Sequence, residues 1–400
     1  MGRDSVSVTL AVGSAPWQKT LALSLLQARM LRRVLGSGPY LEVLDPNGDG
    51  GSLEAVKRFP IYGAVNRVMW GTWKRLPRKW RPPSPVMATV LLQERLCSRW
   101  IPPCSVFHGW MGQSLASLTV AKRQGASTLI ENAGRHPGDF HRAPDEECDR
   151  FNIKRSERSP LLPVALIRRM EREYELCDRI VVPSTVARES FAKFGLGAKA
   201  VVVFPGVDEQ FFSPLLQSER RTKFRVCFTG RIELAKGAGY LLQAWKRLAL
   251  PDAELVLAGE IRPEMKSLLH TYTDSSVRTT GFLSANELLK HYRESDLFVF
   301  PSVNEGLAQV LLEAMASGLP VVASDLSGAG DCVTQRVEGF VTPVRDVERL
   351  AEAILWCYQH RGETQTMGRA ARARIEKQFT LSHYNQRMIA LYRSVAGASP

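Results

Sequence analysis

The most constraining feature of the sequence is a repeated alternation of short apolar runs with longer amphipathic stretches. In the first half, apolar runs at 7–12, 105–110, 127–131 and 179–184 alternate with helix-like stretches at 21–35, 113–125 and 168–177. After Pro205, apolar runs at 224–230, 253–260, 297–302 and 320–324 alternate with helix-like stretches at 238–250, 286–295, 307–318 and 348–361. This alternation is typical of parallel strands joined by crossover helices, so we predict an α/β fold.

The two series predict two domains, over residues 1–205 and 206–380. The segment 201–214 between them carries Pro and Gly at the end of a strand, as an interdomain hinge would. The terminal stretch 381–400 begins with an amphipathic pattern, and we expect it to pack back on the first domain. Domain closure would then occur about Pro205–Val207 and this C-terminal crossover.

Composition excludes several classes of protein. Hydrophobic residues make up 44% and charged residues 23% of the 400 residues, which excludes disordered, collagen-like and disulfide-scaffold chains. The seven cysteines are scattered without a C-x-x-C pair, and neither a signal-peptide core nor a membrane-spanning segment is evident. We therefore expect a cytoplasmic protein.

The charge of the chain is unevenly distributed. The formal net charge is +13, and nearly all of the excess lies in the first half. Within it, residues 57–83 interleave Lys and Arg with Trp70, Trp73 and Trp80. This mixture suits an anionic membrane surface or a phosphorylated acceptor, although a solvated basic loop and helix explains it equally well. Nucleic acid is not an expected partner, because no recognition motif accompanies the charge.

Two carboxylates mark the end of one predicted strand. Glu305, Gly306, Leu307 and Ala308 follow the apolar run 297–302 and lead into a helix that carries Glu313. Free backbone N–H groups at such a helix start attract anions, and Glu313, about two turns further on, can face the same crevice. Carboxylates there would accept hydrogen bonds from sugar hydroxyls. The alternative is an acidic cap with an incidental surface Glu.

A second motif, FTGRIELAKG at 228–237, places Gly230, Arg231 and Lys236 just after another predicted strand. Two cations beside a glycine-rich backbone can clamp a diphosphate and stabilise a phosphate leaving group, although solvated loop cations are the alternative. Both motifs lie at strand carboxyl ends, where open α/β sheets bind ligands. The acidic cluster at 145–149 follows a loop instead, and we interpret it as surface charge. An Asp-x-Asp motif at a strand end would indicate a metal-dependent enzyme, and we find none at the predicted strand ends.

With these motifs, the chain resembles family 4 of the retaining, nucleotide-sugar-dependent glycosyltransferases. The motifs that carry the resemblance lie at 174–184, 205–212, 228–237, 294–324 and 339–346. The resemblance implies the GT-B fold, with two Rossmann-like domains whose parallel sheets face each other across a cleft. It also implies transfer of a sugar to an acceptor hydroxyl with retention of configuration, without a metal or other cofactor.

The resemblance further implies roles for individual residues. Arg231 and Lys236 match the pair that binds the donor diphosphate, Glu305 the residue that touches donor-sugar hydroxyls, and Glu313 the ribose ligand. The remaining donor-site positions are loop residues, namely Gly230 and the Gly306, Leu307 and Ala308 backbone, with Phe282 and Leu283 near the base. Leu307-Ala308 replaces the common Phe-Gly, which leaves the backbone donors in place.

On the first domain, the resemblance gives weaker indications. Members of the family often place a His in the loop where His136 stands, so we include it among the catalytic candidates; a loop His without contact is the alternative. Gly13 and Trp17 stand in a loop that replaces the usual Gly-Gly, and His108 and Glu131 end predicted strands. We interpret these four residues as acceptor-side candidates, with a structural role as the alternative for His108.

Three functional alternatives stay open from the sequence. The favoured acceptor is a lipid-linked or cell-surface polysaccharide, lipopolysaccharide or glycolipid, which would place the protein at the cytoplasmic face of a membrane. A soluble small-molecule acceptor is the first alternative. A noncatalytic nucleotide-sugar-binding subunit for membrane assembly is the second, and a nucleotide-sugar 2-epimerase is the third.

Overall fold

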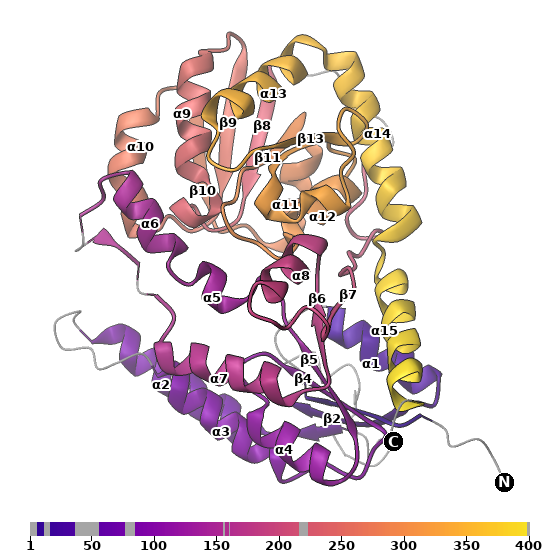
Figure 1. Ribbon diagram of the computed structural model, residues 1–400. Coiled ribbons are helices and arrows are strands. Elements are labelled where there is room, and N and C mark those ends of the chain that lie inside the picture. Colours follow the sequence, from indigo (N-terminus) through magenta and orange to yellow (C-terminus); the bar gives the residue numbers. More distant parts are fainter. Residues whose placement is uncertain are drawn as a thin grey trace.

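The computed structural model describes residues 6–11, 17–36, 56–76, 85–154, 157–159, 161–215 and 223–397. Two parallel sheets form the centres of two domains (Figure 1). The strands of the first sheet have the order β3-β2-β1-β4-β5-β6-β7, and those of the second the order β10-β9-β8-β11-β12-β13. Each order reverses direction once, as in doubly wound α/β folds. The predicted α/β class with two Rossmann-like domains is confirmed.

In the described part of the first domain, seven strands and the helices between them are present. Its strands are β1 Val8–Ala11, β2 Leu31–Gly36, β3 Val56–Arg58, β4 Val106–Trp110, β5 Ser127–Glu131, β6 Arg179–Val182 and β7 Ala200–Val202. Its helices are α1 Trp17–Gln27, α2 Pro60–Arg75, α3 Val86–Ser98, α4 Leu115–Arg123, α5 Pro137–Phe140, α6 Ala143–Arg150, α7 Val164–Leu176 and α8 Thr185–Ala192.

The second domain repeats the pattern. Its strands are β8 Phe224–Thr229, β9 Ala253–Ala258, β10 Val277–Gly281, β11 Leu297–Phe300, β12 Val321–Ser324 and β13 Gly339–Thr342. The α-helices after Pro205 are α9 Ala238–Leu248, α10 Lys266–Tyr272, α11 Ala285–Arg293, α12 Gln309–Ala316, α13 Val347–Gln359, α14 Arg361–Gln378 and α15 Leu381–Ala396. Short 3₁₀ turns lie at η4 Leu234–Lys236, η5 Pro263–Met265, η6 Asp325–Ser327 and η7 Ala329–Asp331.

One predicted element is wrong. We expected a single helix over 21–35, but α1 ends at Gln27 and residues 31–36 form β2, which pairs with β1. The helix stops where Arg29 adopts a φ of 56°, and the Met30 N–H donates to the Leu25 carbonyl oxygen at 2.8 Å. The arginines within 31–35 favour a helix, but burial of Val34 and Leu35 in the sheet stabilises a strand instead.

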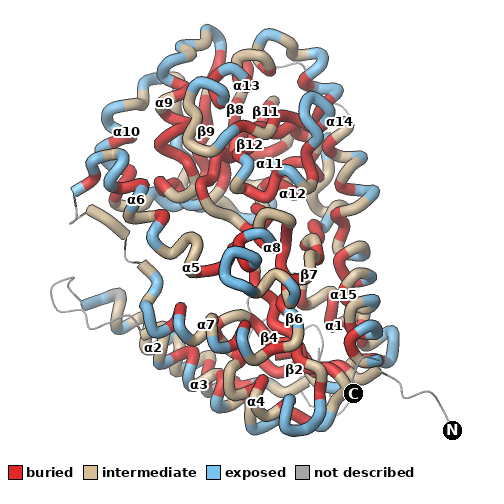
Figure 2. Tube along the Cα trace, in the orientation of Figure 1, coloured by how far each residue is buried: buried red, intermediate tan, exposed pale blue. Residues whose placement is uncertain are grey.

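Each domain exchanges a segment with the other. The C-terminal helix α15 lies beside α1 of the first domain, and its Tyr384, Met388 and Tyr392 join the apolar core around β1 and β4 (Figure 1). In the opposite direction, Cys148 and Ile153 of the first half of the chain join the core of the second domain. Figure 2 shows the buried residues concentrated along the two sheets.

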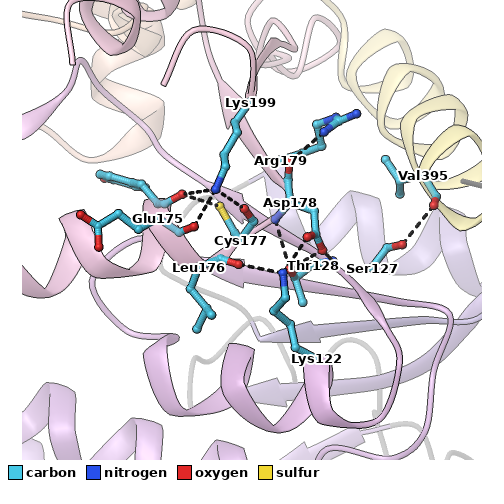
Figure 3. Close-up of polar contacts among 11 residues, drawn as sticks. Lys122, Ser127, Thr128, Glu175, Leu176, Cys177, Asp178, Arg179, Lys199 and Val395 are labelled. Atoms are coloured by element: carbon cyan, nitrogen blue, oxygen red, sulfur yellow. Dashed lines mark hydrogen bonds and ion pairs between the residues drawn. The ribbon is translucent and has the colours of Figure 1, made fainter. Parts of the chain in front are cut away.

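Charged side chains at the amino ends of β5 and β6 serve the fold. Lys199 Nζ donates to the carbonyl oxygens of Tyr174, Glu175 and Cys177, which closes the end of α7 (Figure 3). Lys122 Nζ bonds the Leu176 carbonyl oxygen and the Asp178 carboxylate. Cations at a helix carboxyl end satisfy its last carbonyl groups and complement the helix dipole. These lysines lie at the sheet edge opposite to the candidate site.

Candidate functional site

The candidate site lies where the strand order of the second sheet reverses, between β8 and β11. The loop after β8 leads through Gly230 and Arg231 into η4, which ends at Lys236. The loop after β11 leads through Glu305 and Gly306 into α12. Open α/β sheets bind ligands at this kind of switch point because neighbouring loops diverge there and leave a crevice.

The structure brings two of the predicted residues into direct contact. The Lys236 ammonium forms an ion pair with the Glu305 carboxylate, and both side chains are mostly buried, with exposed fractions of 20% and 17%. Arg231 is more open, with 57% of its side chain exposed, and its Nη2 lies 3.1 Å from Glu233 Oε1. Burial raises the pKa of Glu233. The loops therefore gather two cations and two carboxylates.

Close backbone packing fixes the Lys236 turn. Gly237, directly after Lys236, has a φ of 77°, and a Cβ atom added there would lie 2.0 Å from the Pro301 carbonyl oxygen. Only glycine accepts both this conformation and this contact. The Val303 N–H also donates to the Ala235 carbonyl oxygen at 3.0 Å, which ties the loop after β11 to η4.

Glu313 lies on α12 with little solvent access. Tyr292 of α11 donates a hydrogen bond from its hydroxyl to Glu313 Oε2 at 3.2 Å. Burial raises the pKa of Glu313 to about 7. A carboxylate with so little access to solvent destabilises the folded protein when it ionises, and such a raised pKa is typical of residues in ligand-binding sites.

The other donor-site candidates have mixed surroundings. Phe282 is 87% exposed, and Phe282 and Leu283 follow β10, two strands away from β8 in the sheet. The N–H of Ala308 donates to the Ser327 carbonyl oxygen at 3.2 Å, so this amide is already engaged within the domain.

The first domain closes on the same loop. A Cβ atom on Gly306 would lie 2.5 Å from both the Ala133 carbonyl oxygen and Pro183 Cγ. Ser184 Oγ donates to the Gly306 carbonyl oxygen at 2.6 Å, and Thr185 Oγ1 donates to Asp331 at 2.6 Å. A small cavity continues from this contact, and its lining includes Trp17, Glu131, Asn132 and Leu307.

Three acceptor-side candidates meet in one buried network centred on Glu131. Its Oε1 accepts hydrogen bonds from Trp17 Nε1 at 2.7 Å and from the Tyr384 hydroxyl at 2.9 Å. Its Oε2 accepts from Gln18 Nε2 at 3.0 Å and lies 3.5 Å from His108 Nε2. Both carboxylate oxygens are thus occupied, which suits a structural carboxylate more than a proton acceptor.

His108 belongs to the same buried network. Its Nδ1 lies 2.6 Å from the Tyr392 hydroxyl, and burial lowers its pKa. Tyr384 and Tyr392 belong to α15, so the network fastens this helix to the first domain. The sequence indicated that the terminal helix would pack there but not that its tyrosines would reach the strand ends. Gly13, the fourth candidate, lies outside the described residues.

His136 is placed differently from the expectation. Its ring stacks on Phe194 with a centroid distance of 4.0 Å and meets Phe191 edge-on at 5.0 Å. Its Nδ1 accepts from the Gly138 N–H at 3.1 Å, which caps the short helix α5. Burial lowers its pKa to about 4. The residue is only 2% exposed, so these contacts hold the ring inside the first domain, and a role of His136 in catalysis stays a prediction.

Metal-binding clusters and membrane-spanning helices are both absent from the described residues. No group of three or more His, Cys, Asp or Glu side chains in these ranges is arranged to hold a metal ion. No helix in the described part of the chain has the length and apolar character needed to span a bilayer.

The sequence of the second domain is similar to a family of known proteins. Residues 223–360 match the family model described as Glycosyl transferases group 1. The chain is 30% identical to sulfoquinovosyl transferase SQD2 of Arabidopsis thaliana, over 51% of this chain and 42% of that protein. It is 31% identical to a GDP-mannose-dependent alpha-(1-6)-phosphatidylinositol monomannoside mannosyltransferase of Mycobacterium tuberculosis, over 55% and 62% of the two chains. The aligned region thus spans less than two thirds of each relative.

Solved structures match over nearly the whole chain. Sucrose-phosphate synthase from Thermosynechococcus elongatus superposes with a TM-score of 0.70 at 18% identity, covering 98% of this chain and 100% of that one. Anabaena HepE in complex with UDP superposes with a TM-score of 0.67 at 16% identity, covering 97% and 100%. The chain therefore has the GT-B fold, and residues 223–360 of its second domain are similar to the group 1 glycosyl transferases.

Proposed function

We propose that the protein transfers a sugar from a nucleoside diphosphate sugar to an acceptor hydroxyl, with retention of anomeric configuration. The observation that carries this proposal is the gathering of Arg231, Lys236 and Glu305 at the switch point of the second sheet, opposite the first domain. The names of the relatives support it, since one uses GDP-mannose and the HepE structures contain UDP or UDP-glucose.

The cations would act on the leaving group. When the bond between sugar and diphosphate breaks, negative charge grows on the diphosphate oxygens, and Arg231 and Lys236 stabilise that charge. The backbone N–H groups of Gly306 and Leu307 would add to this stabilisation, whereas that of Ala308 donates to Ser327. A metal ion is then not required, so EDTA should leave the turnover rate unchanged.

The carboxylates would hold the donor. Glu305 would accept hydrogen bonds from hydroxyls of the transferred sugar, while its contact with Lys236 keeps it oriented. Glu313 would accept from the ribose hydroxyls, and Phe282 with Leu283 would lie near the base. The departing phosphate oxygen would take the acceptor proton, which agrees with a Glu131 carboxylate already occupied by Trp17 and Gln18.

The acceptor that we favour is lipid-linked or belongs to a cell-surface polysaccharide. Relatives named for phosphatidylinositol mannoside and for amylovoran biosynthesis support this choice. In the described part of the basic 57–83 segment, helix α2 exposes Arg67 and Val68, and Trp70 packs edge-on against Trp73 at 5.7 Å. Residues 77–83 lie outside the described ranges. Peripheral contact with the cytoplasmic face of a membrane is part of this proposal.

Thermal stabilisation by UDP, GDP, ADP and their sugar conjugates tests the donor site. Selective binding should raise the melting temperature of the wild type. It should do so much less for Lys236→Ala, and as in the wild type for Lys290→Ala, which removes an exposed cation of the same domain. An unselective response, or one that Lys236→Ala retains in full, would contradict the donor-site assignment.

Turnover distinguishes the remaining classes of function. A transferase releases the nucleoside diphosphate and forms a glycoside with the donor's anomeric configuration, which NMR of the product reports. An epimerase returns an isomerised nucleotide sugar, and a binding subunit gives no turnover.

Neutralising Lys74, Arg75, Arg78 and Lys79 together should reduce sedimentation with anionic vesicles without weakening nucleotide binding; unchanged sedimentation would contradict the membrane contact.

A further inference from the structure

Residues 143–154 and 157–159 lie between β5 and β6 of the first domain in sequence but pack on the second domain. Helix α6, which opens this segment, lies beside the second domain near α10 in Figure 1. Cys148 and Ile153 are buried in the core of that domain. At the far end, Ser159 Oγ donates to Glu264 Oε2 at 2.8 Å and accepts from Arg262 Nε at 3.2 Å. We call residues 143–154 together with 157–159 the strap.

The central contact of the strap is a buried carboxylate. Glu147 is fully buried, which corrects our interpretation of the acidic cluster as surface charge. Its Oε2 accepts a hydrogen bond from the Tyr240 hydroxyl at 2.5 Å, and its Oε1 accepts from Arg345 Nε at 2.7 Å. Burial, together with the neighbouring carboxylate, raises the pKa of Tyr240. A buried carboxylate stays in place only while such partners compensate its lost hydration.

The strap lies directly against the turn that carries Lys236. Helix α6 packs on η4, whose last residue is Lys236. The ring of Phe151 fills the space beside Gly239 at the start of α9, where an added Cβ atom would lie 2.8 Å from it. Phe151 also meets Tyr240 edge-on at 5.1 Å. Tyr240, which donates to Glu147, therefore belongs to the same packed group of side chains as Phe151 and the Lys236 turn.

We propose that Glu147 is a positioning residue for the donor site, because it fastens the strap against η4 and so fixes the place of Lys236. This inference rests on the proposed function for its consequence, since Lys236 is the proposed diphosphate ligand. Glu147 itself contacts Tyr240 and Arg345 rather than the site, so it is not a catalytic residue. Without this contact, the strap separates from the turn and the donor meets a less ordered cation.

The test compares Glu147→Gln with Glu146→Gln, which removes the same charge from an exposed neighbour on the same helix. Tyr240→Phe is a milder second variant that removes one hydrogen bond and keeps the ring. Hydrogen exchange followed by mass spectrometry reports the strap at 143–153, the turn at 234–241 and, as a reference, the core strand β11. Donor affinity is measured by titration with the nucleoside diphosphate that stabilises the wild type.

For Glu147→Gln we expect amide exchange in the strap and in the turn to rise about tenfold or more while exchange in β11 stays unchanged. The affinity for the nucleotide should fall by about three- to tenfold, and the KM for the donor should rise accordingly. In a protein that already carries Lys236→Ala, Glu147→Gln should change the nucleotide affinity by less than about twofold. This dependence on Lys236 separates positioning from general destabilisation. Glu146→Gln should match the wild type throughout.

Three results would overturn the proposal. The first is unchanged exchange in the strap or the turn for both Glu147→Gln and Tyr240→Phe. The second is a separated strap with wild-type donor affinity, and the third is an equal affinity loss in the wild-type and Lys236→Ala backgrounds. If the wild type bound no nucleotide, the proposed function would fail, and exchange in the turn alone would decide whether Glu147 fixes the Lys236 turn.

Discussion

Replacing Glu313 by Gln should stabilise the protein at high pH and weaken it as a donor-binding protein. The carboxylate has little access to solvent, and the Tyr292 hydroxyl donates a hydrogen bond to it at 3.2 Å. Burial raises its pKa from 4.5 to about 7, because the ionised form loses hydration that one hydrogen bond does not replace. Glutamine has nearly the same shape and carries no charge, so it avoids this loss.

The magnitude follows from proton linkage. Between pH 4.5 and about 7, the folded protein keeps a proton on Glu313 that the unfolded chain has released, so the free energy of unfolding falls as the pH rises. At about 1.4 kcal/mol for each tenfold change in proton affinity, the full loss above pH 7 is about 3 kcal/mol. The Gln variant lacks this loss. We therefore expect it to match the wild type near pH 4.5 and to exceed its stability by up to about 3 kcal/mol at pH 8.

Urea denaturation of both proteins at pH 5 and pH 8 measures this difference. Glu363→Gln removes an exposed carboxylate of α14 and is the control for the change of charge. The same Glu313→Gln protein should bind the donor nucleotide more weakly, because it can no longer offer a carboxylate to the ribose hydroxyls. A stability difference that is equal at the two pH values would refute the reasoning, and unchanged nucleotide affinity would remove Glu313 from the donor site.

Three further predictions concern the contacts between the domains and the first-domain network. Gly306→Ala should lower turnover more than about tenfold, since its Cβ atom meets the first domain at 2.5 Å, whereas Gly330→Ala, with open space around it, should be neutral; turnover assays compare the two. His136→Ala should cost about 3 kcal/mol in urea denaturation through lost aromatic packing yet leave donor affinity within about twofold. Loss of a general acid or base lowers turnover by about 10² or more, so a folded His136→Ala variant with a loss of this size would support a catalytic role for His136. Tyr384→Phe should destabilise the protein by about 1–3 kcal/mol, because a buried oxygen of Glu131 loses a donor; an unchanged unfolding midpoint would contradict the network.

Much of the fold follows from hydrophobic patterning. Strands β8, β9, β11 and β12 are short apolar runs buried on both faces, as parallel strands between layers of helices must be, so their positions could be predicted. Segment 31–36 could not, because two of its first three residues are arginines, and its pairing with β1 and β3 in the sheet identifies it as a strand. The positive φ of Arg29, where α1 ends, leaves no clear trace in the sequence.

The site was predictable where chemistry and sequence position coincide. Arg231, Lys236 and Glu305 follow strands directly, so the order of the strands is enough to bring their loops together. The surroundings of His136 and Glu147 depend on packing between residues distant in the chain, with Phe194 in one case and Arg345 in the other. A loop histidine and an acidic cluster have the same sequence pattern whether they are exposed or enclosed, so tertiary contact alone decides their roles.

The route of the chain between the domains constrains how the cleft can close. The two crossings near 206 and 380 lie side by side: the Val207 N–H donates to the Phe379 carbonyl oxygen at 2.9 Å, and the Leu381 N–H donates to the Val207 carbonyl oxygen at 3.2 Å. A rotation about Pro205–Val207 therefore has to turn this hydrogen-bonded pair as one unit. The strap is packed in the core of the second domain and α15 in that of the first, so in such a rotation we expect the strap to move with the second domain and α15 with the first. Such a rotation keeps Lys236 fixed relative to the strap and changes the contact of Gly306 with the first domain, which makes that contact the part of the site that responds to closure.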